Sequence, residues 1–404
     1  MILIFGGTTE GRIAIQTLEE AGKTFYYSTK GDEQDVLLHN GIRLQGAMDA
    51  IEIETFCAQH HIKLLIDAAH PFATQLHETL EQVSVESNIP VIRFERIFPK
   101  RDEEHITWCR DYDDAIEKIQ KEKIFILLAL TGVQTIGKLK PLWQNACCYF
   151  RILDRDSSRK LAREQGFYTP GEDEQVLMKQ LHPEAILLKE SGISGGFCEK
   201  VEAARQLGIR IFAICRPKTS DKFICVNGEH GLRRIIEKHL PDFFPLRSGL
   251  TTGTCAAAAA VAATWDVFNI YFKKRPTEFP VVLPNGETIQ VPVEPQHHIP
   301  HSDLLENGDG MFETSATVIK DAGDDPDITN GMKVVANIAI PFRIDDPLPE
   351  DTPQDDYNII VCGGEGVGVV TMPGLGLELG SSAINDTPRE MIKKNVKLWL
   401  ERLH

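Results

Sequence analysis

Two turns rich in glycine and threonine, each at the start of a helix-forming stretch, constrain this chain more than any other feature. Residues 6–12 read GGTTEGR and follow a short apolar run at residues 2–5. Residues 248–255 read SGLTTGTC and precede a run of alanines at 256–260. Alanine has the highest helix propensity and threonine is a good N-cap, so the second turn predicts a helix start. The N–H groups at a helix start suit an anionic ligand, and two such starts indicate two enzymes joined end to end.

Composition and charge exclude several classes of protein. The 404 residues predict two or three domains at about 150 residues each. The net charge of -16 argues against binding to nucleic acid, which requires a basic face. No apolar run approaches the roughly 20 residues that span a bilayer, and the chain begins on a predicted strand rather than a signal peptide. The nine cysteines form no CxxC pair, as is typical of reduced thiols, so we expect a cytoplasmic protein without nucleic-acid or membrane partners.

Residues 1–98 and 105–243 alternate short apolar runs with amphipathic stretches. The expected strands and helices of the first part are strands 2–5, 24–28, 63–67 and 91–94 and helices 12–21 and 51–60. Those of the second part are strands 124–130, 148–153, 185–189 and 211–215 and a helix at 199–207. This alternation predicts parallel βαβ units. A polar segment at 98–104 separates the parts, so we expect two α/β lobes with a cleft between them.

From residue 247 to residue 404 the pattern changes to α+β. The expected strands are 279–283, 289–293, 314–319, 334–340 and 358–362. Residues 345–356 are acidic and contain several prolines, which predicts an exposed loop. An amphipathic helix is expected at 389–403. These stretches indicate a further domain over 247–404.

The turn at 6–12 is the first candidate ligand site. Glycines allow the backbone to approach a phosphate closely, and a turn after an N-terminal strand is where a dinucleotide pyrophosphate binds. The candidate residues are Gly6, Gly7, Thr8, Thr9, Glu10, Gly11 and Arg12. The spacing departs from GxGxxG, so a tight βα turn without a ligand is the alternative interpretation.

The end of the second expected strand discriminates between the two nicotinamide dinucleotides. An NAD site usually has Asp or Glu there to bind the ribose 2′-OH, whereas this chain has Ser28, Thr29 and Lys30. Hydroxyls and a cation would hold a 2′-phosphate, which favours NADP. Asp32 and Glu33 follow closely, and Lys30 as a solvated loop residue remains the alternative.

Four further strand ends carry polar residues. Asp67 and His70 could bind substrate or transfer protons, or Asp67 could cap the next helix while His70 packs as a neutral ring. In the second lobe, Arg151 and Lys189 are candidates for contacts with phosphate or carboxylate groups. The small turn residues at these strand ends are Thr131, Gly132, Ser191 and Gly192. Ordinary turn residues and surface cations are the alternative, but their concentration at strand ends favours a shared ligand face.

Residues 1–243 resemble the precorrin-6A reductases of corrin (vitamin B12) biosynthesis. The motifs that carry the resemblance are GGTTEGR at 6–12, DAAHPFA at 67–73, Thr131-Gly132, KESGISGG at 189–196, Glu199-Lys200 and Arg216-Pro217. The resemblance implies two Rossmann-like lobes with NADPH between them. It also implies reduction of one double bond of precorrin-6A, giving precorrin-6B, with or without cobalt according to the pathway.

The resemblance assigns roles to the candidate residues. NADPH is expected to place its pyrophosphate on Gly6, Gly7, Thr8 and Arg12 and its 2′-phosphate on residues 28–30. Thr131, Gly132, Ser191 and Gly192 complete the expected cofactor site. Because a precorrin carries many carboxylates, cations at the cleft mouth would orient it. The expected catalytic or substrate-side residues are Asp67, His70, Arg151 and Lys189, with His70 as the hypothesised proton donor.

Residues 247–404 resemble the cobalt-precorrin-5B C1-methyltransferases. The motifs are SGLTTGTC with the alanines, VIKDAGDDPD at 318–327, GGEGVG at 363–368 and Ala383-Ile384-Asn385. That family uses S-adenosylmethionine. The cofactor candidates in this region are Thr252, Gly253, Thr254, Gly363, Gly364 and Gly366.

No metal site is expected in this second region. Asp321, Asp324, Asp325 and Asp327 lack EF-hand spacing, so self-capping of the loop is favoured over a cation site. His297, His298 and His301 lie in a proline-rich loop, which favours an ordinary surface role.

The second region has roughly half the length expected of its family, so we expect an incomplete methyltransferase domain, either truncated or one piece of a split enzyme. Expected partners are the precorrin, other corrin-pathway enzymes or the missing methyltransferase half. Two other functions remain open. One is a different NADP-dependent reductase of a polycarboxylate substrate, and the other is a non-catalytic NADP-binding scaffold.

Overall fold

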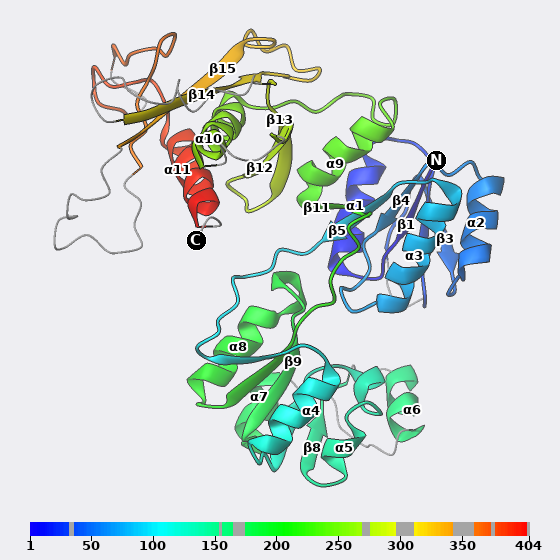
Figure 1. The fold of residues 1–404 in the computed structure, drawn as a ribbon. Coiled ribbons are helices and arrows are strands. Elements are labelled where there is room, and N and C mark those ends of the chain that lie inside the picture. Colours follow the sequence, from blue (N-terminus) through cyan, green and yellow to red (C-terminus); the bar gives the residue numbers. More distant parts are fainter. Residues whose placement is uncertain are drawn as a thin grey trace, which may run out of the picture. The chain divides into compact units, whose positions relative to one another are not determined.

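The computed structural model describes residues 1–31, 36–152, 156–164, 174–268, 275–295, 311–341, 359–372 and 376–401 (Figure 1). Its internal contacts divide the chain into two compact units. The first unit comprises Met1–Ile15 and Thr24–Cys225, and the second comprises Gln16–Lys23 and Val226–His404. Each unit is described by itself below.

The first sheet has six strands in the order β11-β5-β4-β1-β2-β3. The strands are β1 (Ile2–Phe5), β2 (Phe25–Thr29), β3 (Gly41–Gln45), β4 (Leu64–Asp67), β5 (Val91–Glu95) and β11 (Ile224–Asn227). The pairs β1–β2, β1–β4, β2–β3 and β4–β5 are parallel. Every residue of β1, β2 and β4 is buried, as expected for strands covered on both faces. The connecting helices are α1 (Thr9–Glu19), α2 (Ala50–Gln59) and α3 (Thr74–Ser87).

The second sheet has five strands in the order β6-β10-β9-β7-β8. The strands are β6 (Ile106–Cys109), β7 (Ile126–Ala129), β8 (Cys147–Phe150), β9 (Ala185–Lys189) and β10 (Arg210–Ile214), and all four pairs are parallel. The helices are α4 (Tyr112–Lys121), α5 (Lys140–Trp143), α6 (Asp156–Glu164), α7 (Glu174–Leu181) and α8 (Phe197–Gln206), with 3-10 turns η1 (Val133–Thr135) and η2 (Ile193–Gly195). Apolar side chains on both sides of this sheet form two core clusters. The predicted two α/β lobes are confirmed.

The eight strands predicted for these lobes are all present, with ends that differ by at most three residues. Three strands were missed, namely β3, β6 and β11. Strand β3 has no buried residue and reads GIRLQ, so its apolar pattern is weak. Strands β6 and β11 have four residues each and adjoin polar segments, which leaves too short a pattern to recognise.

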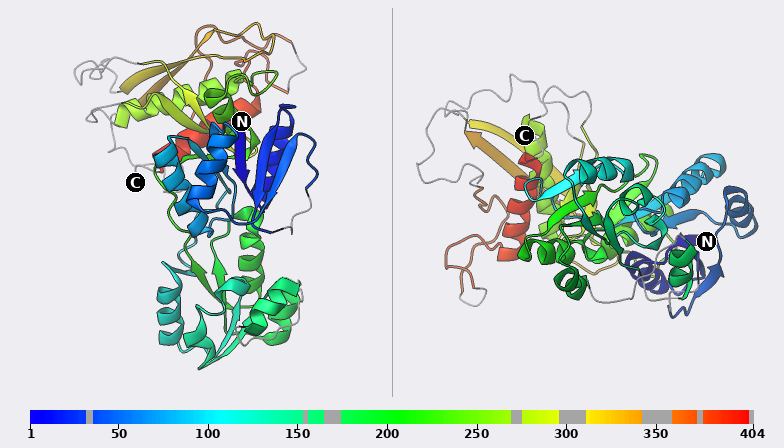
Figure 2. Two further views of the ribbon diagram at one scale, coloured as in Figure 1. Left: turned by 90° about the vertical axis from the view of Figure 1, so that its right-hand side faces the viewer. Right: turned by 90° about the horizontal axis from the view of Figure 1, so that it is seen from below.

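The second unit is α+β, as predicted. It contains α9 (Gly228–His239), α10 (Thr252–Phe268), the antiparallel pair β12 (Glu278–Val282) and β13 (Thr288–Pro292), the antiparallel pair β14 (Met311–Ile319) and β15 (Lys333–Pro341), and α11 (Asp386–Leu400). Helix α10 packs against α11, β14 and β15 at its centre (Figures 1 and 2). Its alanines from Ala257 to Ala263 are buried, because small side chains let the neighbouring elements approach closely.

One predicted strand of this unit is wrong. Residues 359–362, the described part of the expected strand at 358–362, form neither helix nor strand. Ile360 is exposed and residues 363–368 are exposed after it, so no strand partner or core stabilises an extended ladder here. The acidic loop predicted at 345–356 lies outside the described residues. None of the helices in the described part of the chain has the length and apolar character needed to cross a membrane.

Candidate active site

Both sheets of the first unit have a point at which the strand order reverses, and the two points open into one pocket. In the first sheet β1 lies between β2 and β4, and in the second β7 lies between β8 and β9. Ligands of open α/β sheets bind outside the carboxyl ends of the strands at such a switch point. The pocket, with a volume of ≈ 1110 Å³, is lined by Gly6–Thr8 after β1, His70 after β4, Thr131 and Gly132 after β7, and Lys189 at the end of β9.

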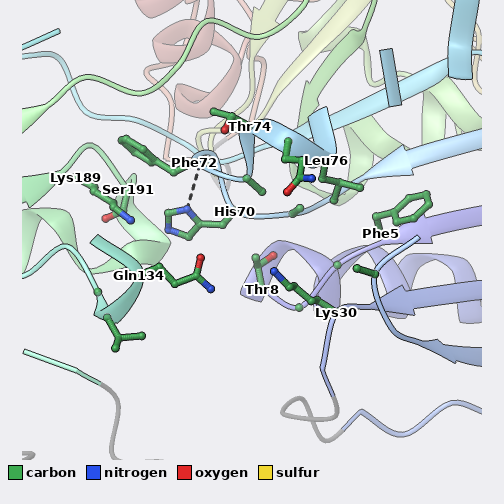
Figure 3. A pocket seen from close by; sticks show the side chains of 18 of the residues that line it. Phe5, Thr8, Lys30, His70, Phe72, Thr74, Leu76, Gln134, Lys189 and Ser191 are labelled. Carbon is green, nitrogen blue, oxygen red and sulfur yellow. Dashed lines mark hydrogen bonds between the residues drawn. The ribbon is translucent and has the colours of Figure 1, made fainter. Parts of the chain in front are cut away.

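Figure 3 shows how the labelled side chains of this pocket are arranged. Thr8 and Lys30 lie on the first-sheet side, and Lys189 and Ser191 lie on the second-sheet side. His70 stands between these groups, with Gln134 close to it from the second sheet's side. Eleven predicted site residues line the pocket, namely Gly6, Gly7, Thr8, Ser28, Lys30, His70, Thr131, Gly132, Arg151, Lys189 and Ser191. Seven predicted residues of the same unit do not line it, namely Thr9, Glu10, Gly11, Arg12, Thr29, Asp67 and Gly192.

The Gly6-Gly7 turn is built around the ring of Tyr27. A Cβ on Gly6 would lie 2.5 Å from Tyr27 Cε2, so glycine is required there by a side chain rather than by a ligand. The Gly7 N–H donates to Tyr27 Oη at 2.9 Å, and Gly7 has a φ of 97°, which also requires glycine. Burial raises the pKa of Tyr27 and keeps its hydroxyl protonated. The glycine at position 6 and the orientation of the Gly7 N–H thus both follow from packing against Tyr27 of β2.

Thr8 connects the turn to the strand beyond. Its Oγ1 donates to the carbonyl of Ala68 at 2.6 Å and accepts from the N–H of Gly11 at 3.1 Å. Gly11 therefore uses its N–H to close the first turn of α1 and is not available to a ligand. The turn after β1 and the loop after β4 are joined at the floor of the pocket.

Glu10 and Gly192 both contact Arg96, a residue that the sequence analysis did not single out. The Arg96 Nε donates to Glu10 at 2.9 Å, and Arg96 Nη1 donates to the carbonyl of Ser191 at 2.7 Å. Ser194 Oγ also donates to Glu10. A Cβ on Gly192 would lie 2.9 Å from Arg96 Cβ. Glu10 and Gly192 therefore belong to a buried junction between the two lobes, while their cofactor role stays a prediction.

Glu190 ties together the two segments that run between the sheets. It is 2% exposed and accepts from Arg101 Nη2 at 2.8 Å and from Arg216 Nη1 at 2.7 Å. Burial alone would raise the pKa of Glu190, but the hydrogen bonds from Arg101 and Arg216 lower it below its usual value. The Arg216 guanidinium also lies over the Phe98 ring, 3.7 Å from its centre. Arg216, which belongs to a motif of the family resemblance, thus has a structural role in this junction.

Asp67 lies beneath the pocket and is 0% exposed. Its carboxylate accepts from Arg93 Nη1 at 2.8 Å, from the Ala69 N–H at 3.1 Å and from His77 Nδ1 at 2.6 Å. Burial would raise the pKa of Asp67, but the hydrogen bonds from His77 and Arg93 lower it. Asp67 is therefore an ionised structural group that cannot touch a substrate, and the helix-cap alternative also fails because α3 has no side-chain cap.

His70 faces the pocket as a neutral ring. Its Nδ1 accepts from the Phe72 N–H at 3.2 Å, which places the ring proton on Nε2. Burial, with the positive charges of Arg96 and Lys189, lowers the pKa of His70 to about 3. The hypothesis that a protonated His70 delivers the proton is therefore not supported at neutral pH. The neutral ring can still donate a hydrogen bond through Nε2.

Lys189 is a cation of the pocket with a lowered pKa. Burial and the neighbouring Lys138 lower the pKa of Lys189 to about 8. Its Nζ lies 5.3 Å from the centre of the Phe72 ring, a distance at which a cation is attracted by the aromatic face. An ammonium with a pKa close to neutral can both pair with a carboxylate and give up a proton.

The end of β2 supplies two of its three predicted phosphate ligands to the pocket. Ser28 and Lys30 line it, whereas Thr29 Oγ1 donates to the Gly31 carbonyl at 2.7 Å. Sequence reasoning missed Arg43 on β3, which is paired in register with Tyr27. Arg43 Nη2 donates to the Gly31 carbonyl at 3.5 Å, and its buried Nε makes no hydrogen bond within the described residues. Nothing in the sequence points to Arg43, because β3 has a weak strand pattern. Its place next to the end of β2 is seen only in the structure.

In the second unit, the predicted cofactor glycines and threonines make contacts within the protein. Thr251 Oγ1 accepts from the Thr254 N–H at 3.1 Å and so caps α10. A Cβ on Gly253 would lie 3.3 Å from Pro388, and one on Gly363 would lie 2.6 Å from Ser382 Oγ. The remaining three candidates, Thr252, Gly364 and Gly366, are exposed.

The acidic residues at 321–327 are engaged by neighbouring donors. Arg247 Nη2 donates to Asp321 at 2.8 Å, and the Arg247 N–H donates to Asp324 at 2.6 Å. Lys320 donates to Asp327, and this hydrogen bond lowers the pKa of the Asp327 carboxyl. These contacts fit the predicted self-capping loop. His297, His298 and His301 lie outside the described residues.

One cluster brings three groups of metal-ligand type together. Single atoms of Glu229, His230 and Glu287 lie within 4.8 Å of one another. Glu287, however, accepts the N–H groups of Glu229 and His230 at 3.2 and 3.1 Å and so caps the start of α9. Helix capping accounts for this cluster.

Comparisons with known proteins assign both parts of the chain. The family model described as precorrin-6x reductase CbiJ/CobK matches residues 1–231, and the CbiD family model matches residues 208–404. A solved structure of CobK precorrin-6A reductase aligns with 59% of this chain and 96% of its own, with 18% identity and a TM-score of 0.49.

Curated relatives match the C-terminal part. The cobalt-precorrin-5B C(1)-methyltransferase of Treponema denticola is 38% identical over 151 residues, 37% of this chain and 35% of the relative. That of Salinispora arenicola is 40% identical over 151 residues, 37% of this chain and 33% of the relative. The chain thus spans about a third of the length of these relatives, less than the half expected from the sequence. On the match over residues 1–231, the chain belongs to the precorrin-6x reductase CbiJ/CobK family, and its residues 208–404 are similar to the CbiD family.

Proposed function

We propose that the first unit is an NADPH-dependent reductase of precorrin-6A, with or without cobalt, in cobalamin biosynthesis. One observation carries the proposal. The phosphate-type turn after β1 and the cations of the second sheet line the same pocket, at the switch points of both sheets. A volume of ≈ 1110 Å³ exceeds the range of about 300–1,000 Å³ typical of a single small-molecule site. This pocket therefore suits a dinucleotide together with part of a large second ligand.

The residues present fit NADPH. Gly7 and Thr8 at the start of α1 would face the pyrophosphate, since a helix N-terminus and a small side chain favour an anion. Ser28 and Lys30, which line the pocket, would hold the 2′-phosphate. Arg43 on the neighbouring strand does not line the pocket, but its buried Nε has no hydrogen-bond partner among the described residues, and we propose it as a third phosphate ligand. Bound NADPH would supply the hydride, and the protein would supply orientation and electrostatics.

The second ligand would meet a cationic wall. Lys138, Arg151, Lys189 and Lys200 line the pocket, and the carboxylates of a precorrin would pair with such groups. Lys189 is our candidate proton donor in place of His70, because its pKa of about 8 leaves it protonated at neutral pH yet able to give up the proton. The neutral His70 would donate a hydrogen bond from Nε2 to the bound ligand.

The test combines binding and turnover. Fluorescence titration should show tighter binding of NADPH than NADH, and precorrin-6A should be reduced with consumption of one NADPH. Binding of NADPH without turnover would favour the scaffold alternative. Turnover restricted to a different polycarboxylate would favour the other reductase. A preference for NADH would overturn the assignment of the 2′-phosphate site.

For the second region we propose a part of a C1-methyltransferase that uses S-adenosylmethionine. The support is 38–40% identity to the two methyltransferases described above, over about a third of their length. We expect no robust methyl transfer to cobalt-precorrin-5B by the purified chain alone. Activity should appear on adding a polypeptide that corresponds to the other two thirds of the relatives. Robust transfer by this chain alone would overturn the incomplete-domain interpretation.

We further propose a cytoplasmic location and domain limits of 1–98, 105–243 and 247–404, with β11 of the second range joining the first sheet and α9 belonging to the second unit. All nine cysteines are free in the structure, including the adjacent Cys147 and Cys148, which is the state expected in a reducing compartment. Limited proteolysis tests the limits, since cleavage should concentrate in 98–104 and 243–247. Cell fractionation tests the location.

A further inference from the structure

We propose that His77 is a positioning residue for the reductase, and that its doubly protonated ring fixes the loop on which His70 and Phe72 enter the pocket. The inference rests on the proposed function for its catalytic consequence, although its structural part can be tested without turnover. His77 lies on α3 and does not line the pocket. The sequence motif at 67–73 ends four residues before it, so no sequence signal drew attention to it.

Both ring nitrogens of His77 meet oxygen atoms. Nδ1 lies 2.6 Å from Asp67 Oδ2, and Nε2 lies 3.2 Å from the His70 carbonyl and 3.3 Å from the Pro71 carbonyl. A carbonyl oxygen can only accept, and an ionised carboxylate can only accept. Each nitrogen must therefore donate, which requires a proton on both and gives the ring a positive charge.

Asp67 is the anion that holds this charge in place. Its other oxygen accepts from Arg93 Nη1 at 2.8 Å and from the Ala69 N–H, so it stays ionised. Arg93 is in turn bound by Glu95 at 2.7 Å. A cation on the first turn of a helix is opposed by the helix dipole, so the ring needs this carboxylate. His77 is 19% exposed, so most of its contact with water is replaced by these partners.

The ring acts on the loop that carries the reactive side chains. Its bonds to two consecutive carbonyls hold the backbone of the residues on either side of the His70-Pro71 peptide. The same short loop carries the His70 ring, which accepts a hydrogen bond from the Phe72 N–H. It also carries the Phe72 ring, whose face lies next to the Lys189 ammonium. His77 therefore determines how His70 and Phe72 of the first lobe stand relative to Lys189 of the second. The charged and titratable groups around this loop are Asp67, His70, Arg93, Glu95, Arg96 and Lys189.

Two substitutions separate the two halves of this contact. In His77→Gln the side-chain amide can reach the position of Nε2 and donate to the loop carbonyls, whereas in His77→Asn it can reach only the position of Nδ1 and donate to Asp67. We expect His77→Asn to lower kcat for precorrin-6A about tenfold, the effect of losing one hydrogen bond to a charged donor, with NADPH affinity unchanged. His77→Gln should restore most of that loss.

His105→Asn is the matched control. His105 Nδ1 also pairs with a carboxylate, Asp102, at 3.0 Å, but it lies on the segment before β6 and outside the pocket. This variant should keep the wild-type kcat. Equal kcat in wild type and His77→Asn, or an equal loss in the Asn and Gln variants, would overturn the positioning role.

The protonation state has a readout that needs no substrate. In the full chain labelled with ¹⁵N-histidine, His77 should show two protonated ring nitrogens at neutral pH, assigned by the loss of its signals in His77→Gln. A His77 with one bare nitrogen would overturn the inference. If wild type bound NADPH but reduced no precorrin, the proposed function would fail while the nitrogen spectrum would still decide the structural claim.

Discussion

The ammonium of Lys189, at the end of β9, lies 5.3 Å from the centre of the Phe72 ring, which belongs to the loop after β4. This contact brings a cation of the second sheet to the loop that carries His70. It also places an aromatic face against a lysine of the pocket whose pKa is lowered to about 8. The carboxyl edges of the two sheets thus meet at Lys189, an ammonium group that can change charge near neutral pH.

The pH dependence of the reductase should follow Lys189. Its folded pKa is lowered from the usual lysine value to about 8, so the ammonium is present below that pH and is lost as the pH rises through it. We expect kcat/KM for the precorrin to be level near neutrality and to fall tenfold per pH unit above about 8. Lys189→Met should abolish this limb and lower the plateau. An unchanged alkaline limb in Lys189→Met would rule out Lys189 as its source.

Lys138 should shift the pH at which kcat/KM falls, through its charge rather than by contact. Its positive charge is one of the two causes that lower the pKa of Lys189, after burial, and its Nζ lies 5.1 Å from the Tyr112 ring centre. Removing the charge in Lys138→Met should move the alkaline limb to higher pH. The measurement is the kcat/KM profile of this variant beside Lys138→Arg, which keeps the charge and should keep the wild-type midpoint.

Arg43 should decide between the two nicotinamide dinucleotides. Because a hydrogen bond to a charged group contributes about 1.5–3 kcal/mol, Arg43→Gln should weaken NADPH binding by about ten- to a hundredfold. NADH has no 2′-phosphate, so its affinity should stay the same. Titrating both dinucleotides against wild type, Arg43→Gln and the exposed control Arg110→Gln checks this. Equal weakening of NADPH and NADH would point to a general loss of the fold around β3.

Glu190 should matter for stability more than for chemistry. Glu190→Gln removes the buried charge to which Arg101 and Arg216 donate. Because the arginine side chains are 41% and 36% exposed and partly screened by water, we expect a loss of about 1.5–3 kcal/mol of unfolding free energy. Urea unfolding of this variant beside the exposed control Glu104→Gln measures the difference. The folded pKa of Glu190 is lowered, so its contribution is present above the ordinary glutamate range and should fade as the pH falls through the folded pKa. Equal midpoints in the two variants would contradict the expectation.

The fold could be predicted from the sequence wherever strands are buried on both faces. Residues 2–5 and 185–188 are continuous apolar runs, and the strands predicted at 2–5 and 185–189 match β1 and β9. Strand β3 failed this criterion, and with it Arg43 was missed. The segment after residue 357 was predicted as a strand from its apolar residues, although strand formation also requires a partner strand.

The candidate site was predictable at the level of strand ends but not at the level of side-chain partners. His70 and Lys189 were placed correctly in one pocket because the carboxyl edges of parallel sheets converge. Asp67 and Glu10 were assigned to ligands, yet their partners Arg93, His77 and Arg96 lie on other elements. Only the three-dimensional structure shows which polar groups are already occupied by one another.

The Glu190 cluster also has a mechanical consequence. The chain passes between the two sheets twice, once after β5 and once after β10, and Arg101 and Arg216 bind both passages to the same carboxylate. Two covalent passages joined at one carboxylate restrict twisting of one sheet against the other. Arg96 donates to both Glu10 and the Ser191 carbonyl and so ties the same lobes at a second place. Lys189 of one sheet and the loop of His70 and Phe72 of the other are therefore held in one relative position.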